Sequence, residues 1–356
     1  MKIFEPKIIE TVKNYDKKSF LRDLVAGIIV AIIALPLSIA LAIASGASPE
    51  QGLYTAIVAG FVIALFGGSR VNISGPTAAF ATIVAGIIAT DGMSGLAVAT
   101  VMAGIILILM GICRMGTLIK YIPEEVTVGF TSGIAVTILV GQLKDFFGLT
   151  YPVGTHAVET TEKITAVINN FGTVNWSGVI VGVIALAILI IWPKVSKKIP
   201  GSLIAVIFGV VIVKLFNMDV NTIGDLYTIS SAPPKFSIPE FDLAKIPGLI
   251  PSAFTIAILA AIESLLSCVV SDGMIDDKHN SNTELIAQGA GNIASALFGG
   301  IPATGAIART AANVKNGGRS PVAGIVHAIT LLLILLILMP YAAWIPMPVI
   351  AAILFH

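Results

Sequence analysis

The chain has 356 residues, of which 56% are apolar and 12% charged, with a net charge of +1 and a mean hydropathy of +0.97. Soluble domains carry about 25% charged residues, so this composition excludes an ordinary soluble protein. The balanced net charge gives no indication of a nucleic-acid-binding protein. Cys113 and Cys268 lie far apart in apolar runs, and the four histidines show no metal-ligand spacing. We expect a multi-pass protein of the lipid bilayer with no metal, no cofactor and no nucleic-acid partner.

The N-terminal segment differs from the rest of the chain. Residues 1–22 (MKIFEPKIIETVKNYDKKSFLR) mix lysine with aspartate and glutamate, and they lack the cleavage site and short apolar core of a secretory signal. We expect them to form a cytoplasmic segment. Residues 23–356 are expected to form one transmembrane domain.

Apolar runs bounded by glycine, proline and charged residues define the predicted membrane spans. They indicate about twelve spans, near residues 23–45, 50–68, 74–90, 95–112, 124–143, 175–192, 199–216, 249–271, 283–299, 303–315, 322–340 and 346–356. The last run is still apolar at His356. We therefore expect either a fragment or a final span that is cut.

The lysines and arginines of the loops predict the orientation. With the N-terminus in the cytoplasm, fifteen of them fall on the inner side, and five fall on the outer side, namely Lys144, Lys163, Lys214, Lys235 and Lys245. Cytoplasmic loops of membrane proteins carry such an excess of positive residues. We expect a protein of the cell inner (plasma) membrane with a cytoplasmic N-terminus.

The sequence Ala-Leu-Phe-Gly-Gly occurs twice, at residues 64–68 and 296–300. Upstream, ALPLSIALAIASGAS (residues 34–48) aligns with AIESLLSCVVSDGMI (residues 261–275), so spans 1 to 3 resemble spans 8 to 10. Because seven spans separate the copies, and seven is odd, the second copy enters the membrane from the opposite side. An inverted repeat of this kind is typical of secondary transporters.

Each Gly-Gly pair is followed by residues that cannot begin a regular helix, NISGP at 72–76 and IPATG at 301–305. Glycine and proline interrupt the helical hydrogen-bond ladder. We therefore expect a few extended residues and then a short helix, starting near Thr77 and near Ala306. Two helix N-termini that meet at the midplane would offer free N–H groups to an anion. The alternative is that the Gly-Gly pairs only allow close helix packing.

Few charged residues lie near the middle of a predicted span, and two of them are candidates for function. Glu263 is near the middle of span 8, with Ser267 one turn later on the same face. Because burial favours the neutral form of a carboxyl group, we expect Glu263 to carry a proton as substrate moves; a structural hydrogen bond between helices is the alternative. Arg309 in span 10 is expected to balance the charge of an anion or to pair with Glu263. Its alternative is to extend to the inner surface.

The segments SRVNISGPTAAF, AIESLLSCVVSDGM and GGIPATGAIARTAANVKNGGRSPVAG resemble the sulfate permease (SulP) family, and the resemblance covers essentially the whole chain. It implies an all-α transporter with a 7+7 inverted-repeat fold, core and gate domains, and an anion held between half-helices of spans 3 and 10. It also implies a homodimer, and it indicates that the last spans and the STAS domain usual in the family are absent from this sequence. The expected substrate-binding residues are Ser38, then Ser74, Gly75, Pro76, Thr77 and Ala78 in the first copy, and Thr304, Gly305, Ala306, Ile307, Ala308 and Arg309 in the second.

The resemblance also bears on coupling. In the family's sodium-coupled bicarbonate members, an aspartate in span 8 and a threonine one turn later hold the cation, whereas this sequence has Glu263 and Ser267, and it has Ile307 where a threonine hydroxyl is expected. We therefore expect proton-coupled symport of sulfate or a related inorganic anion by alternating access, and no enzyme activity. The alternatives are bicarbonate or a C4-dicarboxylate as substrate, and an uncoupled channel or exchanger as mechanism. Nucleobase transporters of the same architecture place a second carboxylate in span 10, where this chain has Arg309.

Overall fold

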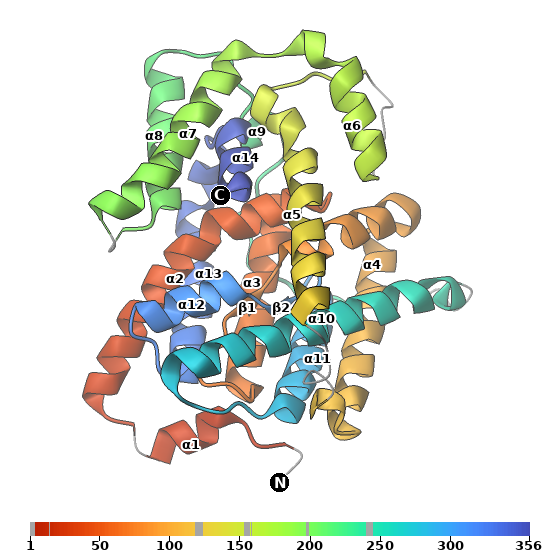
Figure 1. Cartoon of the computed structure of the whole chain (residues 1–356), viewed down its shortest axis with the longest axis vertical. Coiled ribbons are helices and arrows are strands. Elements are labelled where there is room, and N and C mark those ends of the chain that lie inside the picture. Colours follow the sequence, from red (N-terminus) through yellow and green to blue (C-terminus); the bar gives the residue numbers. More distant parts are fainter. Residues whose placement is uncertain are drawn as a thin grey trace.

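A computed structural model describes residues 4–13, 15–117, 124–152, 157, 159–196, 199–239 and 245–356 (Figure 1). In chain order its elements are α1 (Lys7–Lys13), α2 (Lys17–Ala44), α3 (Pro49–Phe66), β1 (Ser74–Gly75), η1 (Ala78–Phe80), α4 (Ala81–Ile112), α5 (Glu124–Phe147), α6 (Thr160–Asn169), η3 (Phe171–Thr173), α7 (Trp176–Val195), α8 (Gly201–Leu215), α9 (Ile223–Leu226), α10 (Ile246–Ile275), α11 (Ser281–Leu297), β2 (Thr304–Gly305), α12 (Ile307–Lys315), α13 (Pro321–Ala342) and α14 (Met347–Phe355).

The predicted spans all correspond to helices. Within the described ranges, six elements are long and apolar enough to cross a membrane: α2, α3, the η1–α4 element, α7, α10 and α13. Polar caps set several helix starts. The carboxylate of Asp16 accepts a hydrogen bond from the backbone N–H of Ser19 at 2.9 Å, so α2 begins at Lys17 rather than near residue 23.

Predicted spans 3 and 4 are the two arms of α4, which meet at Gly92. This residue has φ 69° and ψ −174°, a conformation that interrupts the helix. Glycine reaches positive φ at little steric cost because it has no Cβ. The glycine therefore allows two predicted spans to follow each other without an intervening loop.

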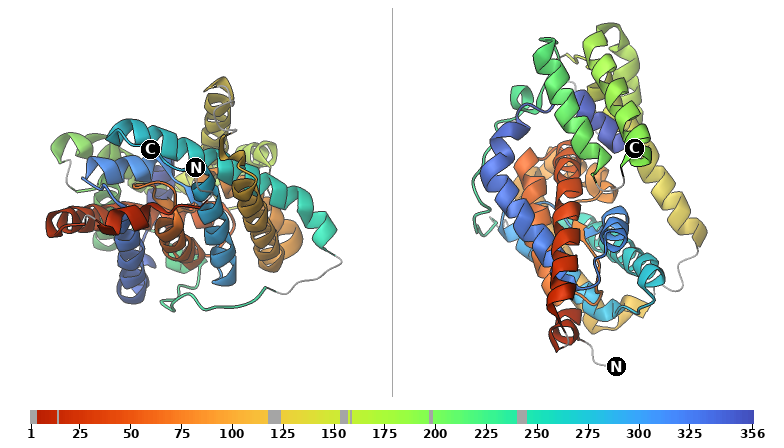
Figure 2. Two further views of the ribbon diagram at one scale, coloured as in Figure 1. Left: turned by 90° about the horizontal axis from the view of Figure 1, so that it is seen from below. Right: turned by 90° about the vertical axis from the view of Figure 1, so that its left-hand side faces the viewer.

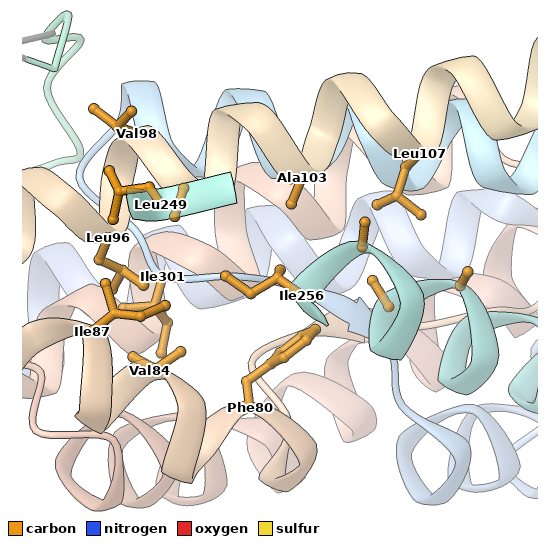
Figure 3. Packing of buried hydrophobic residues seen from close by; sticks show 14 of the residues in the cluster. Phe80, Val84, Ile87, Leu96, Val98, Ala103, Leu107, Leu249, Ile256 and Ile301 are labelled. Atoms are coloured by element: carbon orange, nitrogen blue, oxygen red, sulfur yellow. The ribbon is translucent and has the colours of Figure 1, made fainter. Parts of the chain in front are cut away.

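The helices form two packed bodies (Figure 1). The upper body, which we call the gate, consists of α5, α7, α8 and α14 around a cluster that includes Phe146, Val181, Ala205 and Val349. The lower body, the core, contains both sequence repeats. In it α13 packs beside α2 and α3 (Figure 2). Elements η1 and α4 pack on α10 through Phe80, Val84, Leu96 and Ile256 (Figure 3).

Small residues allow the core helices to approach closely. A Cβ added to Gly104 of α4 would clash with the carbonyl oxygen of Gly289 of α11, and the reverse also holds. Contact of this kind replaces the hydrophobic driving force that helices lack inside a bilayer. The arm of α4 that follows Gly92 is thereby held against α11. Helix α11 also contacts the two non-helical segments predicted at residues 72–76 and 301–305, which we call the first and the second break.

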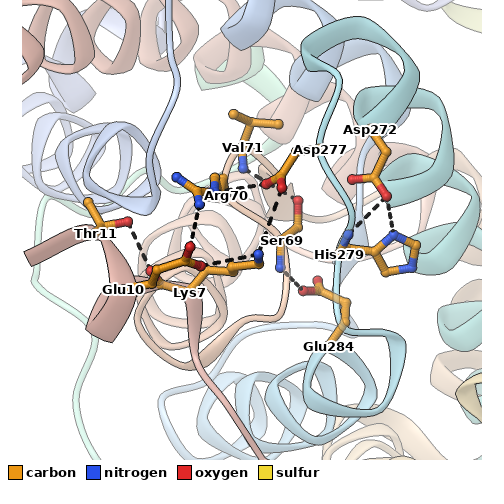
Figure 4. Close-up of polar contacts among 10 residues, drawn as sticks. All are labelled: Lys7, Glu10, Thr11, Ser69, Arg70, Val71, Asp272, Asp277, His279 and Glu284. Carbon is orange, nitrogen blue, oxygen red and sulfur yellow. Dashed lines mark hydrogen bonds and ion pairs between the residues drawn. The ribbon is translucent and has the colours of Figure 1, made fainter. Parts of the chain in front are cut away.

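The N-terminal helix α1 is tied to the core by ion pairs (Figure 4). The Arg70 guanidinium lies 2.8 Å from Glu10 of α1 and 2.8 Å from Asp277, which follows α10. The backbone N–H of Lys7 also donates to the carbonyl of Gly67 at 3.0 Å. Helix α1 therefore joins the segment before the first break to the connection between α10 and α11.

Candidate functional site

The two predicted breaks are extended and pair with each other. Strands β1 and β2 are antiparallel, with Ser74 opposite Gly305 and Gly75 opposite Thr304. One rung further, the N–H of Ala306 donates to the carbonyl of Ile73 at 2.8 Å. The breaks therefore satisfy each other's backbone groups within the membrane-spanning core, where unpaired groups are costly.

This pairing is symmetric. The shift from Gly68 to Gly300, 232 residues, superposes the two Ala-Leu-Phe-Gly-Gly sequences. The same shift moves Ser74 to position 306 and, in reverse, moves Gly305 to position 73. It converts the pair Ser74–Gly305 into the pair Ala306–Ile73, and both pairs are present. The two-residue strands therefore lie on the pseudo-two-fold axis of the inverted repeat.

A helix follows each strand, as predicted. The first begins at Ala78 after Thr77, the second begins at Ile307 after Ala306, and neither preceding residue caps its helix with a side chain. Ile307 and Ala308 are exposed, so the start of α12 faces open space. Uncapped N–H groups and the helix dipole together favour a bound anion.

The candidate site contains one acidic and one basic side chain. Thr77 donates its hydroxyl hydrogen to Oε2 of Glu263 at 2.7 Å. Arg309 donates from Nη2 to the carbonyl of Pro76. The structure thus brings together the first break, the middle of α10 and the first turn of α12, which lie far apart in the sequence.

Arg309 is 1% exposed, and its Nε and Nη1 atoms have no hydrogen-bond partner among the described residues. The alternative reading, in which this side chain extends to the inner surface, is therefore wrong. The expected ion pair with Glu263 is also not formed, because the guanidinium contacts Pro76 instead. Two donor nitrogens of a buried cation remain for another acceptor.

Gly75 makes room for this guanidinium. A Cβ at that position would lie 2.6 Å from Nη1 of Arg309 and 3.4 Å from Ala56. The sequence predicted that this glycine contacts substrate, and the structure shows that it also leaves space for the side chain of Arg309. Its missing side chain lets the positive charge of the second copy approach the backbone of the first.

The other expected residues are placed differently. Ser267 lies one turn beyond Glu263, but its hydroxyl contacts Oδ1 of Asn72 at 2.8 Å and Oγ1 of Thr310 at 3.1 Å. Thr304 shares a 2.6 Å hydrogen bond with Ser264 of α10. Ser38 is fully buried in α2, and its hydroxyl has no hydrogen-bond partner within the described chain.

Sequence reasoning missed a stripe of polar side chains on α11. Glu284, Gln288, Asn292 and Ser295 are all fully buried. Their spacing of four, four and three residues places them on one face of the helix. The signal in the sequence was therefore this helical spacing of polar residues, which predicts a helix whose buried face is polar.

The N-terminal end of the stripe holds the first break. Glu284 accepts from the backbone N–H groups of Gly68 at 2.9 Å and Ser69 at 3.2 Å (Figure 4). Its other oxygen accepts from Asn72 at 2.7 Å and from Gln288 at 3.0 Å. Four donors thus satisfy one buried carboxylate, and Gln288 extends the contact to the Ser74 hydroxyl at 3.1 Å.

The remainder of the stripe holds the second break. Asn292 donates to the carbonyl of Ala303 at 2.8 Å and accepts from its N–H at 2.9 Å. Ser295 donates to the carbonyl of Ile301 at 2.7 Å, and Thr55 of α3 accepts from the N–H of Ile301 at 2.7 Å. One helix therefore fixes both half-sites relative to each other.

Comparison with known proteins agrees with this architecture. The Bacillus subtilis (strain 168) protein YvdB, whose name proposes that it transports sulfate, is 46% identical over 348 residues, or 96% of this chain and 64% of YvdB. The bicarbonate transporter BicA of Picosynechococcus sp. is 35% identical over 349 residues, or 94% of this chain and 60% of BicA. The chain thus spans less than two thirds of the length of these relatives.

The solved transmembrane domain of a cyanobacterial BicA matches the structure with a TM-score of 0.86 and 31% identity, covering 96% of this chain and 88% of that domain. The fold class expected from the sequence, an all-α inverted-repeat transporter fold, is confirmed by this match. The model of the sulfate permease family matches residues 20–356. With both breaks, both half-helices and nearly its whole length accounted for, the chain belongs to the sulfate permease family.

Proposed function

We propose that this chain forms the translocation unit of a secondary transporter that moves sulfate together with a proton by alternating access. One observation carries the proposal: Thr77 binds Glu263 while the neighbouring carbonyl of Pro76 binds Arg309. An ionisable acid and a cation with spare donors thus meet at the same half-helix start, in the core of the molecule.

This arrangement supports coupling through competition. An ionised Glu263 accepts the Thr77 hydroxyl and partly neutralises the field of Arg309, so a second negative charge is disfavoured there. A protonated Glu263 leaves the charge of Arg309 and the uncapped N–H groups of Ala78 and Ile307 to the anion. Proton and anion then each strengthen the binding of the other, because such coupling is reciprocal.

Alternating access would move the core against the gate. The strand pairing and the polar stripe of α11 join the two half-sites within the core, whereas α5, α7, α8 and α14 pack on one another around a cluster of their own. Movement of the core as one body would carry the site past the gate without opening the strand pairing. Inverted-repeat transporters are known to move in this way.

The choice of sulfate rests on similarity. The relative named for sulfate is 46% identical, and the relative named for bicarbonate is 35% identical. Backbone N–H donors and Arg309 suit either anion, so bicarbonate is the second candidate. The C4-dicarboxylates are a third and larger class.

The orientation and assembly belong to the same proposal. The fifteen-to-five distribution of basic residues supports a cytoplasmic N-terminus in the cell inner membrane. The resemblance to the family supports a homodimer. On this orientation the ends of α2 and α5 at Ala44 and Phe147 face the outside.

The test is labelled sulfate uptake into proteoliposomes with an inward proton gradient, with excess bicarbonate or fumarate as competitor. We expect uptake that collapses with the gradient and resists both competitors. In Glu263→Gln, pH-driven accumulation should be lost while sulfate exchange remains. Unchanged pH-driven accumulation in this variant would contradict proton coupling and favour an uncoupled channel or exchanger.

A further inference from the structure

A cavity lies between the core and the gate, away from the strand pairing. It has a volume of about 200 Å³ and is lined by Ala81 and Thr82 of α4, Gln142 and Asp145 of α5, Lys163 of α6 and Tyr227. On the proposed orientation it is at the outer end of the core–gate boundary. Because Ala81 directly follows η1, the cavity adjoins the half-helix of the first break.

Two of its polar side chains lack partners. Gln142 is only 3% exposed, and its Oε1 atom has no hydrogen-bond partner in the described chain. A buried amide without a partner costs free energy. A half-turn about its last bond lets the amide present either its oxygen or its NH₂ group to the cavity.

The ammonium of Lys163 is the second such group. It lies half-buried, 3.7 Å from the position of a Cβ on Gly141, the neighbour of Gln142. No hydrogen bond or ion pair to the Lys163 ammonium is formed among the residues described. Burial lowers the pKa of Lys163, because no anion compensates the lost hydration of its charge.

Asp145 lines the same cavity and opposes an anion. The nearby Lys144 directs its ammonium over the ring of Tyr151, 5.0 Å from the ring centroid, rather than toward Asp145. A cation and a carboxylate in one cavity make an anion site of moderate strength. Moderate strength suits a passage, because an ion on its way must bind well enough to enter and weakly enough to leave.

We propose that this cavity is an outer transit site, in which Lys163 and Gln142 hold the oxyanion before it reaches the half-helices. The inference rests on the proposed function, because it assumes that anions cross between core and gate. It assigns Lys163 an attracting role and Asp145 a repelling role. The two residues should therefore affect substrate in opposite directions.

The first experiment measures KM for sulfate separately from the outer and inner sides of the membrane. In Lys163→Gln the external KM should rise about tenfold, with kcat and the internal KM unchanged. Lys163→Arg should stay near wild type, and Asp145→Asn should lower the external KM. Lys214, whose ammonium lies over the Trp344 ring at 2.9 Å from its centroid, offers the control Lys214→Gln, with no change expected.

External pH gives a further readout. Lys163 should lose its charge at a lower pH than an ordinary lysine, so the external KM should rise at alkaline pH and should not do so in Lys163→Arg. The other charged or titratable groups of the cavity are Lys144 and Asp145 of α5 and Tyr227, whose pKa is raised to about 12 by burial. Equal KM shifts on both sides, or shifts of one sign in Lys163→Gln and Asp145→Asn, would overturn the proposal.

A labelling experiment separates this site from the proposed function. Thr137 also lines the cavity, so Thr137→Cys in a Cys113→Ser background can be modified with a thiol reagent from outside. External sulfate should slow the modification several-fold, and Lys163→Gln should abolish that protection. Protection without sulfate transport would contradict the proposed function but support the transit site. Sulfate transport without protection would contradict the transit site but not the proposed function.

Discussion

The two breaks have the same extended backbone conformation, but side chains of different chemistry hold them in place. The first depends on the carboxylate of Glu284, which accepts four hydrogen bonds, whereas the second depends on the neutral groups of Asn292, Ser295 and Thr55. The same shift of 232 residues that relates the strands places Arg309 at the position of Thr77. Duplication thus kept the main-chain donors, and the side chains diverged into a partner for an acid in one copy and a cation in the other.

The largest effect should follow from removing the cation. Arg309→Gln would withdraw the buried charge and its two unpaired donor nitrogens, and charge-assisted hydrogen bonds contribute about 1.5–3 kcal/mol each. We expect sulfate uptake efficiency, as kcat/KM, to fall about 100-fold. The matched change at the equivalent position, Thr77→Val, removes only a neutral donor to Glu263, and its loss should be about tenfold. Equal losses in the two variants would contradict the division between the copies.

A smaller effect should separate the supports of the two breaks. Glu284→Ala leaves two backbone N–H groups and the Asn72 amide without their acceptor, and it leaves the Gln288 amide with the Ser74 hydroxyl alone, so we expect the free energy of unfolding to fall by about 3 kcal/mol. Asn292→Ala strips one donor and one acceptor and should cost about 1–2 kcal/mol. Thermal unfolding in detergent gives the comparison. If Asn292→Ala were the less stable variant, the first break would not depend more strongly on its carboxylate.

The smallest change adds one methyl group between the copies. Gly75→Ala would place a Cβ in contact with the guanidinium of Arg309, which the Pro76 carbonyl holds in place, so we expect uptake to fall about tenfold while stability falls by about 1 kcal/mol. Gly86→Ala on α4 is the matched control, because no atom lies within 4 Å of its added Cβ. Loss of uptake in both variants would indicate a general effect of added methyl groups in this part of the core rather than an effect at the site.

The sequence was informative where its signal was local or duplicated. Apolar runs located the spans, and the repeated Ala-Leu-Phe-Gly-Gly with its glycine and proline predicted where each half-helix begins. Two start points, Thr77 and Ala306, were predicted to within one residue. Such signals depend on backbone geometry, which neighbouring residues determine.

Side-chain partners could not be predicted in the same way. Ser267 has helical spacing to Glu263, yet it bonds to Asn72 and Thr310, because the pairing of β1 with β2 brings those residues to that face of α10. Glu284 was overlooked because it lies near the predicted inner end of its span, where a charge is ordinary. Its burial follows from the turn at Gly68, which folds over it.

The strand pairing on the pseudo-two-fold axis has a consequence for ancestry. The shift of 232 residues maps this strand pairing onto itself, so the pairing is self-complementary. Each backbone contact that one copy makes with the other could equally be made with an identical chain. Isologous contacts of this kind are those of a two-fold symmetric dimer. A single unduplicated half inserted in both orientations could therefore have closed the same pocket, and fusion of the halves would then have freed each to acquire its own side chains.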